Sequence, residues 1–463
     1  MNIGHQQLEN YIANKRNEVI DMNNDENDNN FNGTAVYYRK ISVDIKMKRS
    51  HDMKSVRSCS GPKKRCQYFH EAMKWVIFVL QIFSLFPVSG FMSLDPNRIN
   101  VNKPRFMIFI NKLLFIMACC EFILMIKIYI NQGVSFNDLS RISFYLSSLY
   151  AVYALHQLAN SWKGFVLYWN SIEKDFLEKF YNEYNPNIKL KIIFVLVILM
   201  SFGIFDHVVF LMDLVADTNQ THFQCNITKY TTWEFLLHRF RPQYLILFNY
   251  HPVLLFVTEW IDVCLTCAWT LQDMFIIAIS IVLTARFAQW NARVKRYELQ
   301  VVPARIWFEL REDFTKLTEL VMKVDETMSM IILIASASNL YQICTNIFQS
   351  LAPRPDILDN VQFWFSLIFT ISRTLLMLHF VAELNEKSFE SRLTLRLIPS
   401  KGWCSEAQRL LDQMVTTEIA LSGRKLFYIT RHSILVIVAS VLTYEIVLID
   451  RIPKEPLNTI KCS

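Results

Sequence analysis

The chain is short of glycine and of charged residues. Only 9 of its 463 residues are Gly, and 19% are Asp, Glu, Lys or Arg, whereas soluble domains carry about 25% charge. So little glycine argues against folds built from strands and tight turns and favours long helices. The sequence also lacks the GxSxG, HExxH, Walker A and dinucleotide-binding motifs. We therefore expect neither an enzyme nor a cofactor.

Apolar residues are what the chain has in abundance. They make up 52% of it, with 35 Phe among them, and they gather in runs of about 20 residues, the length that crosses a bilayer as a helix. Only helices and closed barrels satisfy backbone groups that face lipid. The predicted fold class is therefore an all-α polytopic membrane protein. We interpret the net charge of +7 as topology and headgroup contact, and we expect no nucleic-acid partner.

Residues 1–70 form a polar stretch before the apolar part of the chain. An Asn/Asp-rich run is followed there by a basic half, which predicts a disordered cytoplasmic segment. No signal peptide is recognisable in it. Eight apolar segments follow, at about 73–92, 106–130, 141–160, 190–215, 245–283, 324–351, 361–384 and 432–450.

Two sequons give the orientation of these segments. Asn219 and Asn226 lie between the fourth and fifth segments, and N-glycosylation acceptors indicate an extracellular loop. Counting from that loop back to a cytoplasmic N-terminus leaves no crossing for 73–92, which contains a proline and a glycine. We expect that segment to be an interfacial or re-entrant helix, followed by seven spans and an extracellular tail at 451–463.

Two connections on the predicted cytoplasmic side are long and have a helical, amphipathic pattern. They lie at about 286–323 and 385–431. We expect the first to extend the helices of a ligand-binding bundle at 71–384, and the second to form anchor helices. Together they would pack into a cytosolic helical domain.

Ten cysteines do not form a dense disulfide framework. Cys264 and Cys267 have the spacing of metal ligands. They lie in an apolar segment without a second pair or a histidine cluster, so we predict buried small side chains and no metal. Cys225 and Cys462 would both face outside, and a disulfide between them stays open.

Polar and aromatic residues recur inside several spans, where ionisable groups are costly and indicate function. The hydroxyl groups of a ligand need paired donors and acceptors, and the apolar face of a sugar ring can lie on an indole. Small-molecule sites combine such polar groups with aromatic walls. We predict a site for a polyhydroxy ligand formed by Asp206, His207, Trp260, Trp269, Asp273, Asn339, Tyr341, Asn346, Trp364 and Arg373.

These residues also have structural interpretations. Asp206 or Asp273 can pair with Arg373 and lock the helices together, because intramembrane charges usually pair with one another. Trp260 and Trp364 fit an interfacial aromatic belt. His207 beside its acidic neighbour is either a pH sensor or a structural histidine.

The last apolar segment, 432–450, is a candidate pore helix. A pore-lining helix has a narrow, mostly apolar face. Leu442, Ile446 and Ile449 fall on one face, next to Asp450, which would form a cation-favouring acidic ring in a symmetric oligomer. From these residues alone, an ordinary lipid-facing helix is the preferred alternative.

The same segment resembles a family signature. Thr443-Tyr444-Glu445 and the four apolar residues after it are similar to the TYhhhhhQF pattern of insect gustatory receptors, with Glu after Tyr as in their sugar-receptor branch. Asp450-Arg451 departs from the usual Gln-Phe. The resemblance covers about residues 70–450. Its further pieces are Asp273-Met-Phe-Ile-Ile, Leu283-Thr-Ala-Arg286-Phe, Ser338-Asn-Leu-Tyr341, Phe363-Trp-Phe-Ser-Leu, Ser372-Arg-Thr374, Leu384-Asn-Glu386 and Ala420-Leu-Ser-Gly-Arg-Lys425.

This resemblance implies a tetrameric, ligand-gated, non-selective cation channel that senses sugars in the plasma membrane of chemosensory neurons. Its architecture would be similar to that of insect odorant receptors, with four final helices around one pore. Homotetramers and heteromers with related subunits both stay open. The alternatives are a receptor for bitter or other non-sugar ligands, a seven-span G-protein-coupled receptor with its N-terminus outside, and a secondary transporter, which should show internal repeats.

Overall fold

The computed structural model describes residues 67–101, 105–133, 136–178, 187–225, 230–350, 354 and 356–451. Several sequence-based expectations fall outside these ranges. They are the disordered segment before residue 67, the sequon at Asn226, Cys462 and the tail after residue 451.

Within the described ranges the regular structure is helical, apart from two isolated antiparallel bridges, Ser89–Asn100 and Ser422–Tyr428. The expectation of an all-α protein is confirmed. The long helices are α4 (Arg105–Gln132), α5 (Phe136–Glu178), α6 (Ile188–Gln224), α9 (Pro252–Lys295), α10 (Ala304–Gln349), α11 (Ile357–Phe389) and α14 (Arg431–Arg451). The short ones are α3 (Phe69–Ile82), α7 (Thr232–Phe240), α8 (Pro242–Leu245), α12 (Arg392–Arg396) and α13 (Ser405–Thr416), with 3₁₀ turns at Pro96–Arg98 and Ser400–Gly402.

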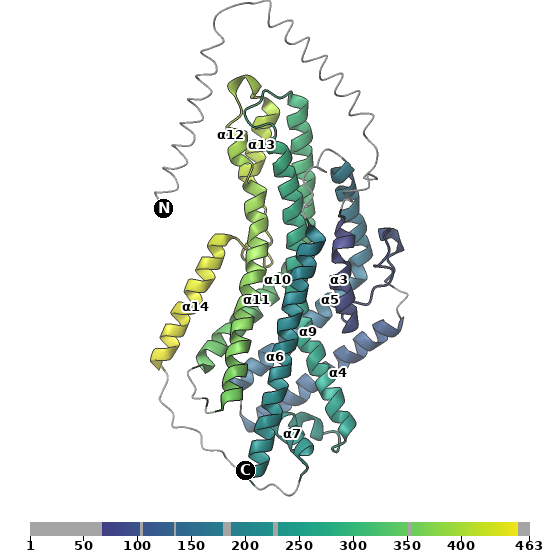
Figure 1. Ribbon diagram of the computed structural model, residues 1–463, viewed down its shortest axis with the longest axis vertical. Coiled ribbons are helices and arrows are strands. Elements are labelled where there is room, and N and C mark those ends of the chain that lie inside the picture. The colour runs from purple at the N-terminus through teal and green to yellow at the C-terminus, as the bar shows by residue number, and fades with distance from the viewer. Residues whose placement is uncertain are drawn as a thin grey trace, which may run out of the picture. The chain divides into compact units, whose positions relative to one another are not determined.

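Helix α9 forms the core of the bundle. Its most apolar stretch is 83% buried, against 22% for α4, and every side chain from Thr270 to Phe287 is buried. A helix that is apolar on all sides has to be surrounded by others. Helices α5, α6, α10 and α11 pack around it, and Figure 1 shows it running beside α10 and α11.

Four of the described helices are long and apolar enough to cross a membrane: Arg105–Asn131, Ile188–Gln224, Pro252–Lys295 and Ile357–Arg396. The predicted segment 141–160 lies in the first part of α5, and the predicted segment 324–351 corresponds to the second half of α10, which ends at Gln349. Both helices carry more polar residues. The number of spans therefore stays a prediction.

Helices α9 and α10 are much longer than a bilayer requires. They contain 44 and 46 residues, whereas about 20 residues cross the hydrocarbon core. Their connected ends, together with α12 and α13, form one end of the bundle (Figure 1). Trp290 donates a hydrogen bond to the Leu310 carbonyl at 3.0 Å, and Arg293 pairs with Asp313 at 3.3 Å. The stretch 286–323 is therefore a packed helical pair.

Helix α13 is attached to α10 by a charged hydrogen bond. Arg311 Nε donates to Glu406 at 2.8 Å, and this contact holds the pKa of Glu406 below its usual range. Leu410 and Met414 of α13 are fully buried. The segment 385–431 thus contains the end of α11, α12, α13 and a hairpin.

Three predicted boundaries are wrong. The helix expected at 73–92 ends at Ile82, because Ser84 turns the chain with a φ of 56° and a proline follows. The helix expected from residue 245 begins only at Pro252, where the His251 side chain accepts a hydrogen bond from Val253. The sequon at Asn219 lies within α6 and not in a loop, because the helix continues to Gln224.

A hairpin at residues 421–429 joins α13 to α14. Its turn is closed by a hydrogen bond from Leu426 N–H to the Gly423 carbonyl at 3.0 Å. The two central residues, Arg424 and Lys425, have φ angles of 55° and 60°. This is the type I′ arrangement, which favours Asn and Gly at both positions. Two long side chains there leave the turn strained by about 1–2 kcal/mol each.

Contacts with the long helices hold this hairpin in place. The buried Asp325 carboxylate on α10 accepts hydrogen bonds from Ser422 N–H at 2.6 Å and from Ser422 Oγ at 2.9 Å. Asn385 on α11 donates to the Ile419 carbonyl at 3.0 Å. The start of α14 is therefore tied to both α10 and α11.

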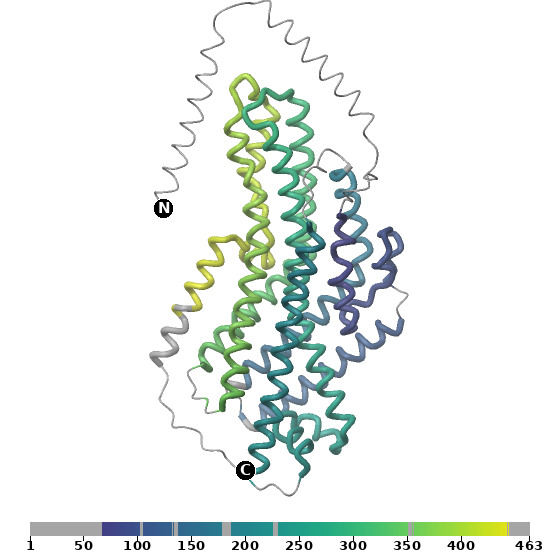
Figure 2. Tube along the Cα trace, viewed as in Figure 1, coloured from purple at the N-terminus to yellow at the C-terminus, as the bar shows by residue number. Residues whose placement is uncertain are grey.

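Helix α14 then diverges from the bundle, as the tube view shows (Figure 2). It contacts α10 and α11, while Leu435, Val436 and Val438 are 40–69% exposed. An apolar helix with so much uncovered surface is available for lipid or for other subunits.

Candidate ligand-binding site

A cavity of about 530 Å³ lies between α5, α6, α9, α10, α11 and the segment from Phe240 to Gln243. Its volume is in the range of small-molecule sites. The uncharged polar residues that line the cavity carry amide and hydroxyl groups. They include Ser140, Gln243, Thr266, Gln342, Gln362 and Ser366.

Three of the predicted ligand-binding residues line this cavity: Asp206 and His207 from α6, and Trp269 from α9. Asp206 Oδ1, His207 Nε2 and Trp269 Nε1 are buried and have no hydrogen-bond partner among the described residues. A buried polar atom without a partner costs about 1–3 kcal/mol. These atoms offer an acceptor, a ring nitrogen that can take either role, and a donor.

Two neighbouring side chains hold the Trp269 indole in place. The Arg373 guanidinium carbon lies 4.2 Å from its ring centroid, and the Phe144 ring meets it edge-on at 5.9 Å. A cation over an indole face is attracted by the ring quadrupole. The indole therefore has a fixed orientation at the wall of the cavity.

Three other predicted residues form a buried ion network behind the cavity and do not line it. Arg373 Nε lies 3.1 Å from Asp273 Oδ2, and Asn339 donates to the same oxygen at 2.9 Å. Arg373 also donates to Asn339 Oδ1 at 3.3 Å and to Thr270 Oγ1 at 2.8 Å. These four residues, the Arg373 network, join α9, α10 and α11. The structural interpretation of Asp273 and Arg373 is the one that the geometry supports.

The other four predicted residues are not brought together. Trp260 and Trp364 are 52% and 47% exposed and lie outside the cavity lining. Asn346 accepts a hydrogen bond from the lining residue Gln342 at 3.0 Å. Tyr341 lies half-buried on α10 without lining the cavity.

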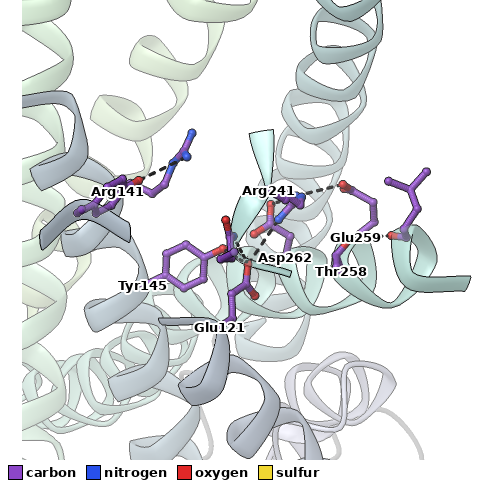
Figure 3. A network of polar contacts seen from close by, with 10 residues as sticks. Glu121, Arg141, Tyr145, Arg241, Thr258, Glu259 and Asp262 are labelled. Atoms are coloured by element: carbon purple, nitrogen blue, oxygen red, sulfur yellow. Dashed lines mark hydrogen bonds and ion pairs between the residues drawn. The ribbon is translucent and has the colours of Figure 1, made fainter. Parts of the chain in front are cut away.

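A second ion network, centred on Arg241, borders the cavity (Figure 3). Arg241, the residue before α8, is 6% exposed. Its guanidinium lies 2.8 Å from Asp262, 3.1 Å from Glu259 and 3.7 Å from Glu121. Glu121 also accepts hydrogen bonds from Tyr145 at 2.5 Å and from Gln243 at 3.2 Å. These residues, the Arg241 network, join α4, α5, α8 and α9.

Sequence reasoning did not place Arg241 or Glu121 in the site. Arg241 lies between two short helices, outside every apolar segment, and Glu121 precedes it by 120 positions in the chain. The available signal was a single carboxylate inside the apolar run 106–130, which has to find a partner.

Acidic residues continue beyond the cavity into a neighbouring pocket of about 430 Å³. Arg239 pairs with one of them at 3.0 Å, and Arg354 with another at 2.9 Å. Carboxylates still outnumber the arginines there, so the potential is negative and disfavours anionic ligands. The carboxylates are Asp213, Asp217, Asp356 and Asp359.

The predicted pore residues Leu442, Ile446, Ile449 and Asp450 belong to α14, but their side chains are outside what the structure describes. Cys225 is disulfide-bonded. Whether it pairs with Cys462, which lies outside the described residues, stays open. Cys264 and Cys267 are free thiols.

The fold has relatives among solved structures. The insect olfactory receptor OR5 from Machilis hrabei matches 81% of this chain and 97% of its own, with a TM-score of 0.55 and 14% identity. The same receptor in complex with eugenol matches with a TM-score of 0.58 and 12% identity, over 82% and 99% of the two chains. The fold of this chain is thus similar to that of the olfactory receptor OR5.

Sequence comparison gives the family. Residues 55–462 match the family described as "Trehalose receptor". "Gustatory receptor for sugar taste 64b" of Drosophila melanogaster is 32% identical over 388 residues, covering 82% of this chain and 94% of the relative. "Gustatory receptor 5a for trehalose" of the same species is 27% identical, covering 82% and 85%. The chain belongs to the trehalose receptor family of sugar gustatory receptors.

The family assignment confirms the resemblance drawn from the sequence. It also confirms the expectation of a receptor and not an enzyme.

Proposed function

We propose that this protein is a taste receptor for sugars that acts as a ligand-gated, non-selective cation channel. The observation that carries the proposal is the cavity of about 530 Å³. Two of its lining residues, Trp269 and Asp206, have a buried donor and a buried acceptor without a partner among the described residues. The cavity occurs in a chain of the trehalose receptor family. Sugar hydroxyls supply both missing partners.

The charge of the cavity supports a neutral ligand. Carboxylates line it and the adjacent pocket, which disfavours anions, while amides and hydroxyls are suited to a polyhydroxy compound. The Trp269 indole offers an apolar face for a sugar ring. Asp206 and His207 would bind hydroxyls from the opposite helix.

Gating would follow from differential affinity. A ligand shifts a conformational equilibrium only if it binds one state more tightly. We propose that sugar binding favours a state in which α14 moves outward, because α10 and α11 border the cavity and also hold the start of α14.

The assembly we propose is a tetramer in the plasma membrane of chemosensory neurons, formed by this chain alone or with related subunits. Four copies of α14 would surround one cation pore, with Leu442, Ile446, Ile449 and Asp450 facing it. The N-terminus would be cytoplasmic and the C-terminus extracellular. The helix ends near 286–323 and the segment 385–431 would join the subunits in the cytosol. Asn219 and Asn226 would carry glycans.

Whole-cell recording from cells that express this chain alone tests the proposal. Mono- and disaccharides should evoke a cation current that does not depend on G proteins. If the chain reaches the cell surface and no sugar evokes a current, while a non-sugar tastant does, the ligand class is wrong. If an evoked response requires G proteins, the channel mechanism is wrong.

A further inference from the structure

The Arg241 network has a role that goes beyond joining helices. Long helices line most of the cavity, but Phe240, Arg241 and Gln243 close it on one side, at the junction of the short helices α7 and α8. The backbone hydrogen bonds of this junction are local, from Arg241 N–H to the Leu237 carbonyl at 3.0 Å and from Tyr244 N–H to the Arg241 carbonyl at 3.3 Å, so side-chain contacts tie it to the long helices. Arg241 and Gln243 are 6% and 4% exposed, and both are bound through the network.

Glu121 is the residue on which these contacts converge. Its Oε1 atom accepts hydrogen bonds from Gln243 and from Tyr145 and lies 3.7 Å from Arg241. It is 1% exposed and does not line the cavity. Any influence of Glu121 on a ligand would therefore be transmitted through the side chains that it holds.

The charges explain why the segment is held firmly. One guanidinium faces three carboxylates, of Glu121, Glu259 and Asp262. Each carboxylate therefore contributes to holding Arg241, and loss of Arg241 itself would leave one buried and two half-buried acids without a counter-charge. Its Nε atom is buried and has no hydrogen-bond partner among the described residues.

We infer that Glu121 and Glu259 are positioning residues for the sugar site: they hold Arg241 and Gln243 as one wall of the cavity and so set the affinity for ligand. This inference rests on the proposed function. It assigns a role in ligand affinity to two carboxylates that do not touch the ligand.

Substitutions at Glu121 can distinguish an effect on ligand affinity from a general loss of folding. Glu121→Leu removes the shared acceptor, and a leucine suits an apolar helix, so insertion is not impaired. Glu121→Gln keeps an acceptor oxygen. We expect Glu121→Leu to raise the sugar concentration for half-maximal current about fivefold or more, the effect of one hydrogen bond, with the maximal current unchanged. Glu121→Gln should restore the affinity.

Two further variants complete the design. Glu259→Leu removes a second contact of Arg241 and should loosen the same wall. It replaces Glu121→Leu in the experiment if that variant does not reach the cell surface. Cys120→Leu is the matched control, because Cys120 is the exposed neighbour of Glu121 on α4 and has no place in the network. It should leave the affinity unchanged.

The rate of thiol labelling, measured without sugar, tests whether Glu121 holds this wall of the cavity in place. A thiol introduced by Phe240→Cys, in the Cys120→Leu background of the purified full chain, is labelled with a maleimide. The labelling should be slow, and Glu121→Leu should accelerate it, while Glu121→Gln should not. An unchanged labelling rate, or faster labelling with an unchanged sugar affinity, would overturn the inference. Faster labelling in a chain without any sugar-evoked current would instead overturn the proposed function and leave the wall in place.

Discussion

Trp269 and Asp273 lie four positions apart on α9 and have different roles. Trp269 lines the cavity, and its buried indole N–H has no partner among the described residues. Asp273 is 0% exposed and bound to Arg373 and Asn339. A ligand can reach the first residue and not the second. Substitutions at the two positions should therefore fail in different ways.

Trp269→Phe keeps an aromatic wall and removes the donor. We expect the half-maximal sugar concentration to rise about fivefold, since one hydrogen bond contributes about 1 kcal/mol, with normal surface expression. Dose–response curves measure this. Trp260→Phe is the control, because Trp260 is 52% exposed and outside the cavity lining; equal shifts in both variants would contradict the assignment.

Asp273→Asn should impair folding and not ligand selectivity. It leaves the Arg373 guanidinium, 2% exposed, without its counter-charge, and breaking a buried pair costs about 3–5 kcal/mol. Surface biotinylation should show much less protein at the plasma membrane. Asp206→Asn, at a cavity-lining residue, should reach the surface and respond weakly. Normal expression of Asp273→Asn would argue against a structural lock.

Among the elements, the hairpin at 421–429 carries backbone strain at two consecutive residues. Its central residues have positive φ angles, yet Asp325 holds it through Ser422. Strain at such a position persists only where the surroundings impose it. The hairpin leads directly into α14, so its stability bears on the position of that helix.

Replacing Arg424-Lys425 by Asn-Gly should relieve this strain. We expect the hairpin to gain about 1–2 kcal/mol, seen as a higher unfolding midpoint of the purified chain. If α14 moves on gating, the same change should also favour the state seen here and reduce sugar sensitivity. Leu426→Gly is the control, since Leu426 is exposed and its φ is not positive. A lower midpoint for Asn-Gly would show that the native side chains make contacts worth more than the strain.

At the scale of the whole molecule, α14 is an apolar helix with an uncovered face next to a continuous bundle. That arrangement suits an oligomer in which copies of α14 meet. Asp450 would then form an acidic ring at the end of the pore. Its charge would raise the local concentration of cations.

Asp450→Asn should lower the preference of the sugar-evoked current for cations over anions. Reversal potentials in a salt gradient measure this preference. Wild-type and variant channels with identical reversal potentials would mean that Asp450 does not face the pore. Lys401→Gln, in the connection between α12 and α13, is a matched single-charge control.

Hydrophobic periodicity predicts the helices well. The segments 361–384 and 190–215 lie inside α11 and α6, whose ends extend further because polar residues continue the helix past the apolar run. The site is predicted only in part. Periodicity places Trp269 and Asp273 on one helix without saying which faces a cavity, and Arg241 meets Glu121 only through the tertiary fold.

The Arg241 network also constrains the order of biosynthesis. Glu121 is translated 120 residues before Arg241. If α4 crosses the membrane as proposed, this carboxylate would therefore enter it before Arg241 is made. An acidic residue at mid-membrane costs about 2.5–3.5 kcal/mol on insertion, which the apolar remainder of α4 offsets. The nascent chain would then carry a carboxylate without its counter-charge until the residue before α8 has emerged, and intermediates of that length are the ones that membrane chaperones would have to retain.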